Sequence, residues 1–189
     1  MTILVDMDDT LEQLVKAWVK RANEKFGRNA EPNDITAWNV GAAYPGIPRE
    51  DVYGVIDEPG FWRSVEPMPG AQEALKHLMD EGHEVFIVTA TEIGHVEEKM
   101  KDLLFRYFPF LTWEQVIITS RKQMIRGDVL IDDGIHNLEG GQYRKILFTA
   151  PHNRFYDAEA NGMIRVDTWE EIVRLLDGGS VRPAEDLSR

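Results

Sequence analysis

The strongest constraint on the fold is a set of short segments made almost entirely of apolar residues. A strand that is apolar throughout, rather than at every second position, is buried on both faces, as in a parallel sheet covered by helices. Helical patterns of apolar residues separate these segments, and this alternation is typical of α/β proteins. The sequence therefore predicts an α/β fold with a parallel sheet. The expected strands lie at residues 2–5, 85–88, 116–118, 129–131 and 146–148.

The first helical pattern is followed by a segment of different character. Apolar residues recur at helical spacing from Leu11 to Phe26, and Gly27 stands where a helix C-cap is expected. Beyond it, Gly and Pro recur among aromatic residues. We interpret residues 28–65 as a small cap insertion that is too small to be stable alone. The alternative is a long irregular connection within one domain.

The remaining residues, 1–27 and 66–177, are expected to form the core domain. Its last helix begins at a capping box that runs from Thr168 to Glu171. Residues 178–189 contain few apolar side chains, so we expect a mobile C-terminal tail.

Composition narrows the class of protein. The chain has 189 residues, a length that suits one domain. Its formal net charge is −12, which disfavours polyanionic partners such as nucleic-acid polymers or anionic membranes. It has no long uncharged apolar run, no N-terminal stretch of signal-peptide type and no cysteine. We therefore expect a cytoplasmic protein with a small-molecule partner. The oligomeric state is left open, a homodimer included.

Polar residues stand where the expected strands end. Asp6 and Asp8 follow the first strand, Thr89 follows the second, and Asp132 and Asp133 follow the fourth. Sites in open parallel sheets form outside the carboxyl ends of the strands. Carboxylates that meet there repel one another, and a hard cation such as Mg²⁺ relieves the repulsion. For any single aspartate, capping the next helix is the alternative.

Asp6 and Asp8 are separated by one residue at the end of a strand, so their side chains can point to the same side once the chain leaves the extended conformation. One carboxylate could then act as a nucleophile and the other could transfer a proton. Thr89 offers a hydroxyl, and nearby backbone N–H groups could bind an oxyanion. Lys122 follows the third expected strand and could supply a positive charge; a solvated surface lysine is the alternative.

Four segments together resemble the motifs of the haloacid dehalogenase superfamily of phosphatases. They are VDMDDT (5–10), IVTA (87–90), Lys122 and LIDD (130–133). Members that dehalogenate lack the second acid, so the presence of Asp8 implies phosphoryl transfer. Further stretches at 66–71, 118–133 and 148–153 are similar to the 5′(3′)-deoxyribonucleotidase family.

The resemblance implies a Rossmann-like three-layer core with a small helical cap inserted after the first strand and helix. It implies that Asp6 is the nucleophile and that Asp8 is the acid and base. Phosphate-binding roles fall to Thr89, Ala90 and Lys122. The Mg²⁺ ligands would be Asp6, the main-chain carbonyl of Asp8 and Asp132, with Asp133 in support.

Candidates for contact with a nucleobase are Trp38, Phe61, Trp62 and Ile93, and ordinary packing is the alternative for each. The chain departs from the family in its cap. It also has Asp9 where Gly is frequent, and Gly134 where Arg or Lys is frequent.

The expected function is Mg²⁺-dependent hydrolysis of nucleoside monophosphates, with deoxyribonucleotides favoured, through an aspartyl-phosphate. A phosphatase for another small metabolite, such as a sugar phosphate, is the alternative within the enzyme class. A signalling receiver domain is the alternative of a different class. It also uses aspartates, Mg²⁺, Thr and Lys, but it has a different motif order and no such insertion.

Overall fold

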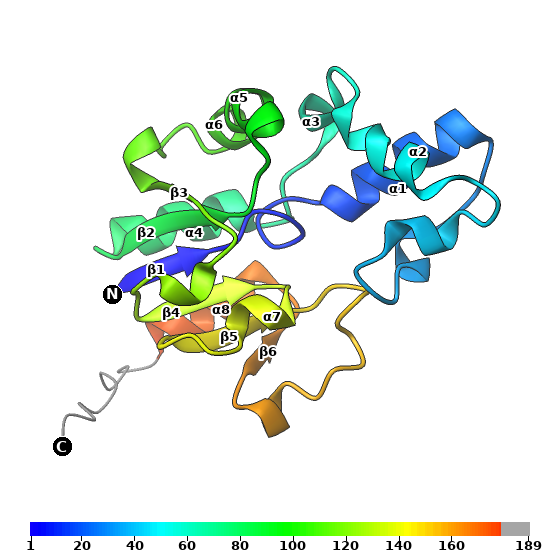
Figure 1. Cartoon of the computed structure of the whole chain (residues 1–189). Helices are drawn as coiled ribbons and strands as arrows, with labels where there is room; N and C mark the ends of the chain where they lie inside the picture. The colour runs from blue at the N-terminus through cyan, green and yellow to red at the C-terminus, as the bar shows by residue number, and fades with distance from the viewer. Residues whose placement is uncertain (179–189) are drawn as a thin grey trace.

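The computed structural model describes residues 1–178, so all of the expected tail except Gly178 lies outside the described residues. Its centre is a six-stranded sheet in the order β3-β2-β1-β4-β5-β6, and every pair of neighbours is parallel (Figure 1). The predicted α/β class with a parallel sheet is thereby confirmed. The strands are β1 (Thr2–Val5), β2 (Glu84–Thr89), β3 (Val116–Ile118), β4 (Val129–Asp132), β5 (Arg144–Phe148) and β6 (Ile164–Val166).

Helices cover both faces of the sheet. Along β1, Ile3 and Val5 face the larger apolar core, while Leu4 faces a smaller core on the opposite side. Helices α4 and α8 pack on the first face and α7 on the second, which gives the three layers visible in Figure 1. Among the described residues, no helix has the length and apolar character needed to cross a bilayer. The α-helices are α1 (Leu14–Phe26), α2 (Arg49–Tyr53), α3 (Phe61–Ser64), α4 (Ala71–Asp80), α5 (Val96–Glu98), α6 (Phe105–Tyr107), α7 (Ile135–Leu138) and α8 (Trp169–Asp177).

Local signals mark the ends of two helices as expected. Gly27 ends α1 with a φ of 61°, a left-handed conformation that glycine adopts without strain. The Thr168 hydroxyl accepts a hydrogen bond from the Glu171 N–H at 3.2 Å at the start of α8. The sequence pattern missed β6, because this edge strand has three residues and a charged Arg165 at its centre.

The cap consists of short helical segments that pack on α1. The Trp18 indole N–H donates to the Val52 carbonyl at 2.8 Å, and the Tyr44 hydroxyl donates to the Val19 carbonyl at 3.1 Å. Figure 1 shows α1 beside α2, away from the sheet. The apolar stripe of α1 predicted that one face is buried, but not that its neighbours come from the insertion. We therefore propose that the cap includes α1 and extends over about residues 14–65.

Candidate active site

The sheet order brings the expected site residues to one edge. Because β1 lies between β2 and β4, the carboxyl ends of these three strands are neighbours. The Asp6 N–H donates to the Ile131 carbonyl at 2.9 Å, which keeps the chain beside β4 after β1 has ended. Asp6, Thr89 and Asp132 are consequently buried at three adjacent strand ends.

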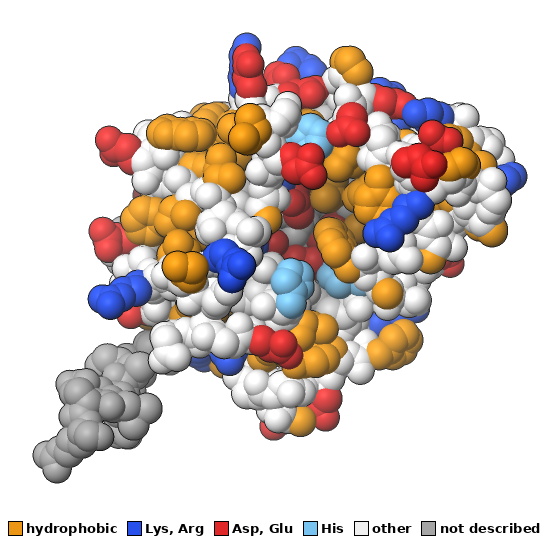
Figure 2. All heavy atoms as spheres, viewed as in Figure 1, with side chains coloured by type: hydrophobic (Ala, Val, Ile, Leu, Met, Phe, Trp, Pro, Cys, Tyr) orange, Lys and Arg blue, Asp and Glu red, His pale blue; other side chains and the backbone are white. Residues whose placement is uncertain are grey.

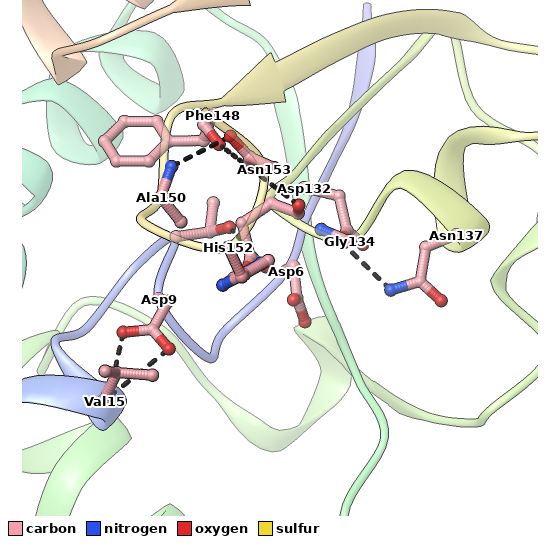
Figure 3. A network of polar contacts seen from close by, with 12 residues as sticks. Asp6, Asp9, Val15, Asp132, Gly134, Asn137, Phe148, Ala150, His152 and Asn153 are labelled. Atoms are coloured by element: carbon pink, nitrogen blue, oxygen red, sulfur yellow. Dashed lines mark hydrogen bonds and ion pairs between the residues drawn. The ribbon is translucent and has the colours of Figure 1, made fainter. Parts of the chain in front are cut away.

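Asp9 builds the turn that follows Asp8. Its φ is 51°, in the left-handed region that favours glycine but that aspartate tolerates better than most residues. The Asp9 carboxylate accepts from the Val15 N–H at 3.0 Å and 3.3 Å (Figure 3), and so ties the turn to the start of α1. This bond gives a reason for aspartate at a position where the family resembled by the sequence often has glycine. Burial, with Asp133 adding to it, raises the Asp9 pKa well above its usual value.

Lys122 lies between two of the aspartates. Its ammonium group forms ion pairs with Asp6 and, at 2.7 Å, with Asp132. Burial alone would lower the pKa of Lys122, but the two carboxylates raise it above its usual value. Burial and the nearby Asp132 raise the Asp6 pKa to about 7, against the lowering effect of Lys122. Lys122 is therefore a buried cation of the site rather than a solvated surface lysine.

Asp132 is also fixed by the chain that follows it. One carboxylate oxygen accepts from the Gly134 N–H at 2.7 Å and from the Asn137 side-chain amide at 3.0 Å (Figure 3). A Cβ at position 134 would lie 2.7 Å from that Asn137 amide, so a longer side chain would have to displace it. This crowding accounts for the glycine at a position where the resembled family often has Arg or Lys.

Asp133 faces a histidine from the loop after β5. Its carboxylate pairs with His152 Nε2 at 2.9 Å, and its main-chain carbonyl accepts from the Asn153 side-chain amide at 2.9 Å. Burial raises the Asp133 pKa, although the bond to His152 works in the opposite direction. The short loop that carries His152 and Asn153 thus helps to hold the carboxyl end of β4.

Three carboxylates form a cluster with the spacing of metal ligands. Asp6, Asp132 and Asp133 each offer one oxygen, and these oxygens lie within 4.8 Å of one another. All three residues are buried, so their mutual repulsion is poorly screened. An all-carboxylate donor set of this kind fits a hard divalent cation. Two members are expected ligands, and the third, Asp133, was expected in a supporting role.

Asp8 is held by a second buried lysine, which the sequence reasoning missed. Lys99 Nζ donates to the two Asp8 carboxylate oxygens at 2.6 Å and 2.8 Å, and lies 3.3 Å from the Thr89 hydroxyl. Burial pushes the Asp8 pKa upward, but Lys99, Glu12 and Lys122 together outweigh it, and the net pKa lies below its usual value. Glu12 is buried close by, and burial followed by the charge of Asp8 raises its pKa well above normal.

The sequence did contain a signal for Lys99. The residue lies in the π-helical segment η5 (Lys99–Leu104), three residues after Val96 and four before Leu103 on the buried side of the helical pattern. A lysine on an apolar stripe needs a buried partner. That partner could not be named from the sequence, because Asp8 lies 91 positions away.

A cavity of about 510 Å³ opens above these groups. Figure 2 shows it as a hollow with acidic side chains in its depth and histidines at its rim. Of the expected phosphate-binding residues, Ala90 and Lys122 line the cavity, whereas Thr89 lies behind it and bonds to Lys99. The residues that line the cavity are Asp6, Asp8, Thr36, Ala37, Trp38, Ala90, Ser120, Lys122, Asp133, Gly134, Ile135, His136, Asn137, Glu139 and His152.

Of the four residues expected to contact the nucleobase, one lines the cavity and three do not. Trp38 lines the cavity and meets the His152 ring edge-on, with the ring centroids 4.8 Å apart. Phe61 and Trp62 are buried in the cap, and Ile93 projects into solvent. Within the described chain, these last three are not part of the cavity wall.

Near Trp62, a hydrogen bond and an ion pair join the cap to the core. There the Gly60 N–H donates to the Glu98 carboxylate at 2.6 Å, and Arg63 pairs with Asp102 at 2.9 Å. Trp62 itself lies over the Lys99 ammonium, 4.7 Å from the ring centroid.

Comparison with known proteins agrees with this geometry. The family model for "5′ nucleotidase, deoxy (pyrimidine), cytosolic type C protein" matches residues 1–181. A 5′(3′)-deoxyribonucleotidase of Bacillus subtilis (strain 168) is 38% identical over 176 residues, which cover 92% of this chain and 97% of that protein. A 5′(3′)-deoxyribonucleotidase of Clostridium acetobutylicum is 32% identical over 176 residues, 93% and 94% of the two chains.

Solved structures show the same fold at lower identity. A haloacid dehalogenase family hydrolase from Deinococcus radiodurans R1, solved with bound phosphate and sodium, superposes with a TM-score of 0.62. The two sequences are 18% identical, and the match covers 97% of this chain and 98% of that one. The chain described here shares its fold with a haloacid dehalogenase family hydrolase. It belongs to the deoxy 5′ nucleotidase family and is an enzyme of the phosphatase class.

Proposed function

We propose that this enzyme hydrolyses deoxyribonucleoside monophosphates through an aspartyl-phosphate formed on Asp6, with Mg²⁺ as cofactor. The observation that carries the proposal is that Asp6 and Asp8 line one cavity while separate buried lysines hold them. Two carboxylates in different environments can take different roles in one reaction. Lys122 and Ala90 line the same cavity, and the Lys122 ammonium group and the Ala90 N–H would bind the phosphate oxygens.

In the first step, a carboxylate oxygen of Asp6 attacks phosphorus. The bond from phosphorus to the ester oxygen breaks, its electron pair stays on that oxygen, and Asp8 delivers the proton that makes it an alcohol. In the second step, Asp8 takes a proton from water while the water oxygen attacks phosphorus. The bond to Asp6 then breaks, which releases inorganic phosphate and restores the Asp6 carboxylate.

The metal would be held by Asp6 and Asp132 together with the main-chain carbonyl of Asp8, and Asp133 lies close enough to support it. When bound, Mg²⁺ would neutralise part of the carboxylate and phosphate charge and keep Asp6 ionised for attack. The buried carboxylates support this assignment, because burial first and repulsion from neighbouring carboxylates second raise their pKa values, and a bound cation offsets both.

The expected substrate class follows from the cavity wall and from the relatives. Trp38 stands at the cavity with an exposed indole, and an aromatic ring of this kind can stack on a nucleobase. The similar proteins from Bacillus subtilis and Clostridium acetobutylicum are 5′(3′)-deoxyribonucleotidases. We expect the reaction to take place in the cytoplasm. Membership of a phosphatase family sets the receiver-domain alternative aside.

A panel of phosphate esters tests the proposal. The enzyme is assayed with 5′- and 3′-deoxyribonucleotides, ribonucleotides, sugar phosphates and p-nitrophenyl phosphate, each with Mg²⁺ and after chelation. We expect the highest kcat/KM on deoxyribonucleotides and no turnover after chelation. A clear preference for a sugar phosphate would replace the proposed substrate class, and full activity without metal would refute the metal assignment.

A further inference from the structure

We propose that Lys99 is a positioning residue that fixes the Asp8 carboxylate for proton transfer without contacting the substrate itself. The inference rests on the proposed function, because it assigns Lys99 a role in the work of Asp8. Three observations carry it: the bonds that Lys99 makes, its place outside the cavity, and the packing that holds its own side chain.

Lys99 Nζ makes three hydrogen bonds, which matches the three N–H donors of its ammonium group. Two contacts run to the Asp8 carboxylate oxygens at 2.6 Å and 2.8 Å, and the third, at 3.3 Å, reaches the Thr89 hydroxyl. A carboxylate gripped at both oxygens has little freedom to rotate about its last bond, so the direction of its remaining lone pairs is set. Lys99 itself is 1% exposed, whereas the Asp8 side chain is 20% exposed toward the cavity.

Lys99 does not stand in the wall of the cavity, although Asp8 and Lys122 do. Lys99 and Lys122 are the buried lysines of the described chain, and they serve different carboxylates. Lys122 pairs with Asp6 and Asp132 and faces the phosphate position, while Lys99 stands behind Asp8. Any effect of Lys99 on the reaction must therefore pass through Asp8 or Thr89.

The side chain of Lys99 is held from behind. The Trp62 ring covers its ammonium at 4.7 Å, and the flanking Glu98 and Asp102 bind the cap through Gly60 and Arg63. Lys99 begins a π-helical segment, a wider turn that is frequent at functional sites. The packing of cap against core thus fixes the position from which Lys99 grips Asp8.

The test compares Lys99→Met with Lys101→Met, a matched control on the same helical segment whose lysine is exposed. The substrates are a deoxyribonucleotide and p-nitrophenyl phosphate, whose leaving group departs without needing a proton. Steady-state constants, the early release of p-nitrophenolate and thermal melting are measured for both variants and for the wild type.

We expect Lys99→Met to lose about 10- to 100-fold in kcat on the nucleotide, part of the range for acid–base catalysis, with little change in KM. With p-nitrophenyl phosphate, attack by Asp6 should continue while hydrolysis of the aspartyl-phosphate slows. The variant should then release a burst of p-nitrophenolate that approaches one equivalent per enzyme and exceeds that of the wild type. Lys101→Met should behave as the wild type.

A kcat for Lys99→Met close to that of the wild type would overturn the inference. So would a loss of activity that follows the loss of folded protein and brings no larger burst, because a purely structural role predicts that result. If Lys99→Met does not fold, Lys99→Gln, which keeps an N–H donor in the buried space, is judged by the same burst. A wild type inactive on both substrates would refute the proposed function instead.

Discussion

The floor of the cavity and its cap wall are built in opposite ways. The floor consists of Asp6 and Lys122, which line the cavity, and of Asp132 directly behind them. All three residues are at most 5% exposed, and Lys122 forms ion pairs with both aspartates. On the wall, Trp38 is 51% exposed, and its aromatic partner is His152 at 4.8 Å between centroids. The floor fixes charged groups against one another, whereas the wall presents a ring with room to move.

This difference assigns separate tasks to the two regions. Attack on phosphorus needs a carboxylate and cations in fixed positions, and the floor supplies them whatever alcohol the ester carries. Discrimination among esters must come from groups that contact the rest of the substrate, and those stand on the wall. Changes to the floor should therefore affect every substrate, and changes to the wall should affect only substrates that reach it.

The largest effect is expected from Asp6→Asn, because an amide cannot act as the attacking carboxylate. Turnover should fall by on the order of 10³-fold or more on nucleotides and on p-nitrophenyl phosphate alike, with the fold preserved by circular dichroism. Mass spectrometry should exclude deamidation back to aspartate. Near-native turnover on any ester would break the assignment of the chemistry to the floor.

Asp132→Asn should weaken the metal site next. We expect the Mg²⁺ concentration for half-maximal activity to rise by roughly tenfold or more, since one anionic ligand of a three-carboxylate cluster is lost. Titration of activity with Mg²⁺ after chelation measures this shift. An unchanged Mg²⁺ dependence would remove Asp132 from the metal site.

Replacing the two cap tryptophans, Trp38 and Trp62, tests the role of the cavity wall in substrate discrimination. Trp38→Ala should raise KM for deoxyribonucleotides by roughly 5- to 150-fold, the equivalent of one lost base stack, and leave p-nitrophenyl phosphate little changed. Trp62→Ala is the matched control, because Trp62 is buried and stands outside the cavity wall. It should lower the melting temperature, since removing a buried indole costs about 3–5 kcal/mol.

Equal losses on all esters for Trp38→Ala would mean that this ring only supports the cap. A selective rise in KM for Trp62→Ala, without loss of stability, would move base recognition to the buried end of the cap.

The smallest effect is expected from pH on the metal-free protein. The pKa values of the floor carboxyl groups are raised in the folded state, with Asp6 going from 3.8 to about 7, so the folded state binds more protons than the unfolded chain in this interval. The free energy of unfolding should therefore fall as pH rises from about 4 to about 7. Asp8 contributes in the opposite direction, because its pKa is lowered.

Thermal melting in a chelator at pH 5 and pH 7.5 should reveal the slope as a shift of a few degrees. Saturating Mg²⁺ should reduce the slope, and Asp6→Asn should make it shallower in the chelator, because the other buried carboxyl groups remain. A melting temperature that rises over this interval would contradict the raised pKa values of the buried floor carboxyl groups.

Sequence reasoning anticipated the floor better than the wall. Asp6, Thr89 and Asp132 follow apolar strands directly, and a parallel sheet places strand ends side by side whatever the loops do. No such rule shows from the sequence which tryptophan lines the cavity, because Trp38 and Trp62 both lie in segments rich in Gly and Pro. The two residues differ in burial, since Trp38 is exposed and Trp62 is buried, and burial depends on contacts with distant segments.

The sequence by itself determined the α/β class, the parallel sheet and the meeting of two aspartate pairs at one edge, because strand periodicity and chain order encode these. The tertiary structure decided that α1 packs against the insertion, that Lys99 bonds to Asp8, and that Trp38 rather than Trp62 lines the cavity. The physical reason is the same in each case. A periodic pattern states which side of an element is buried, but its partner is chosen by packing between segments that are far apart in the chain.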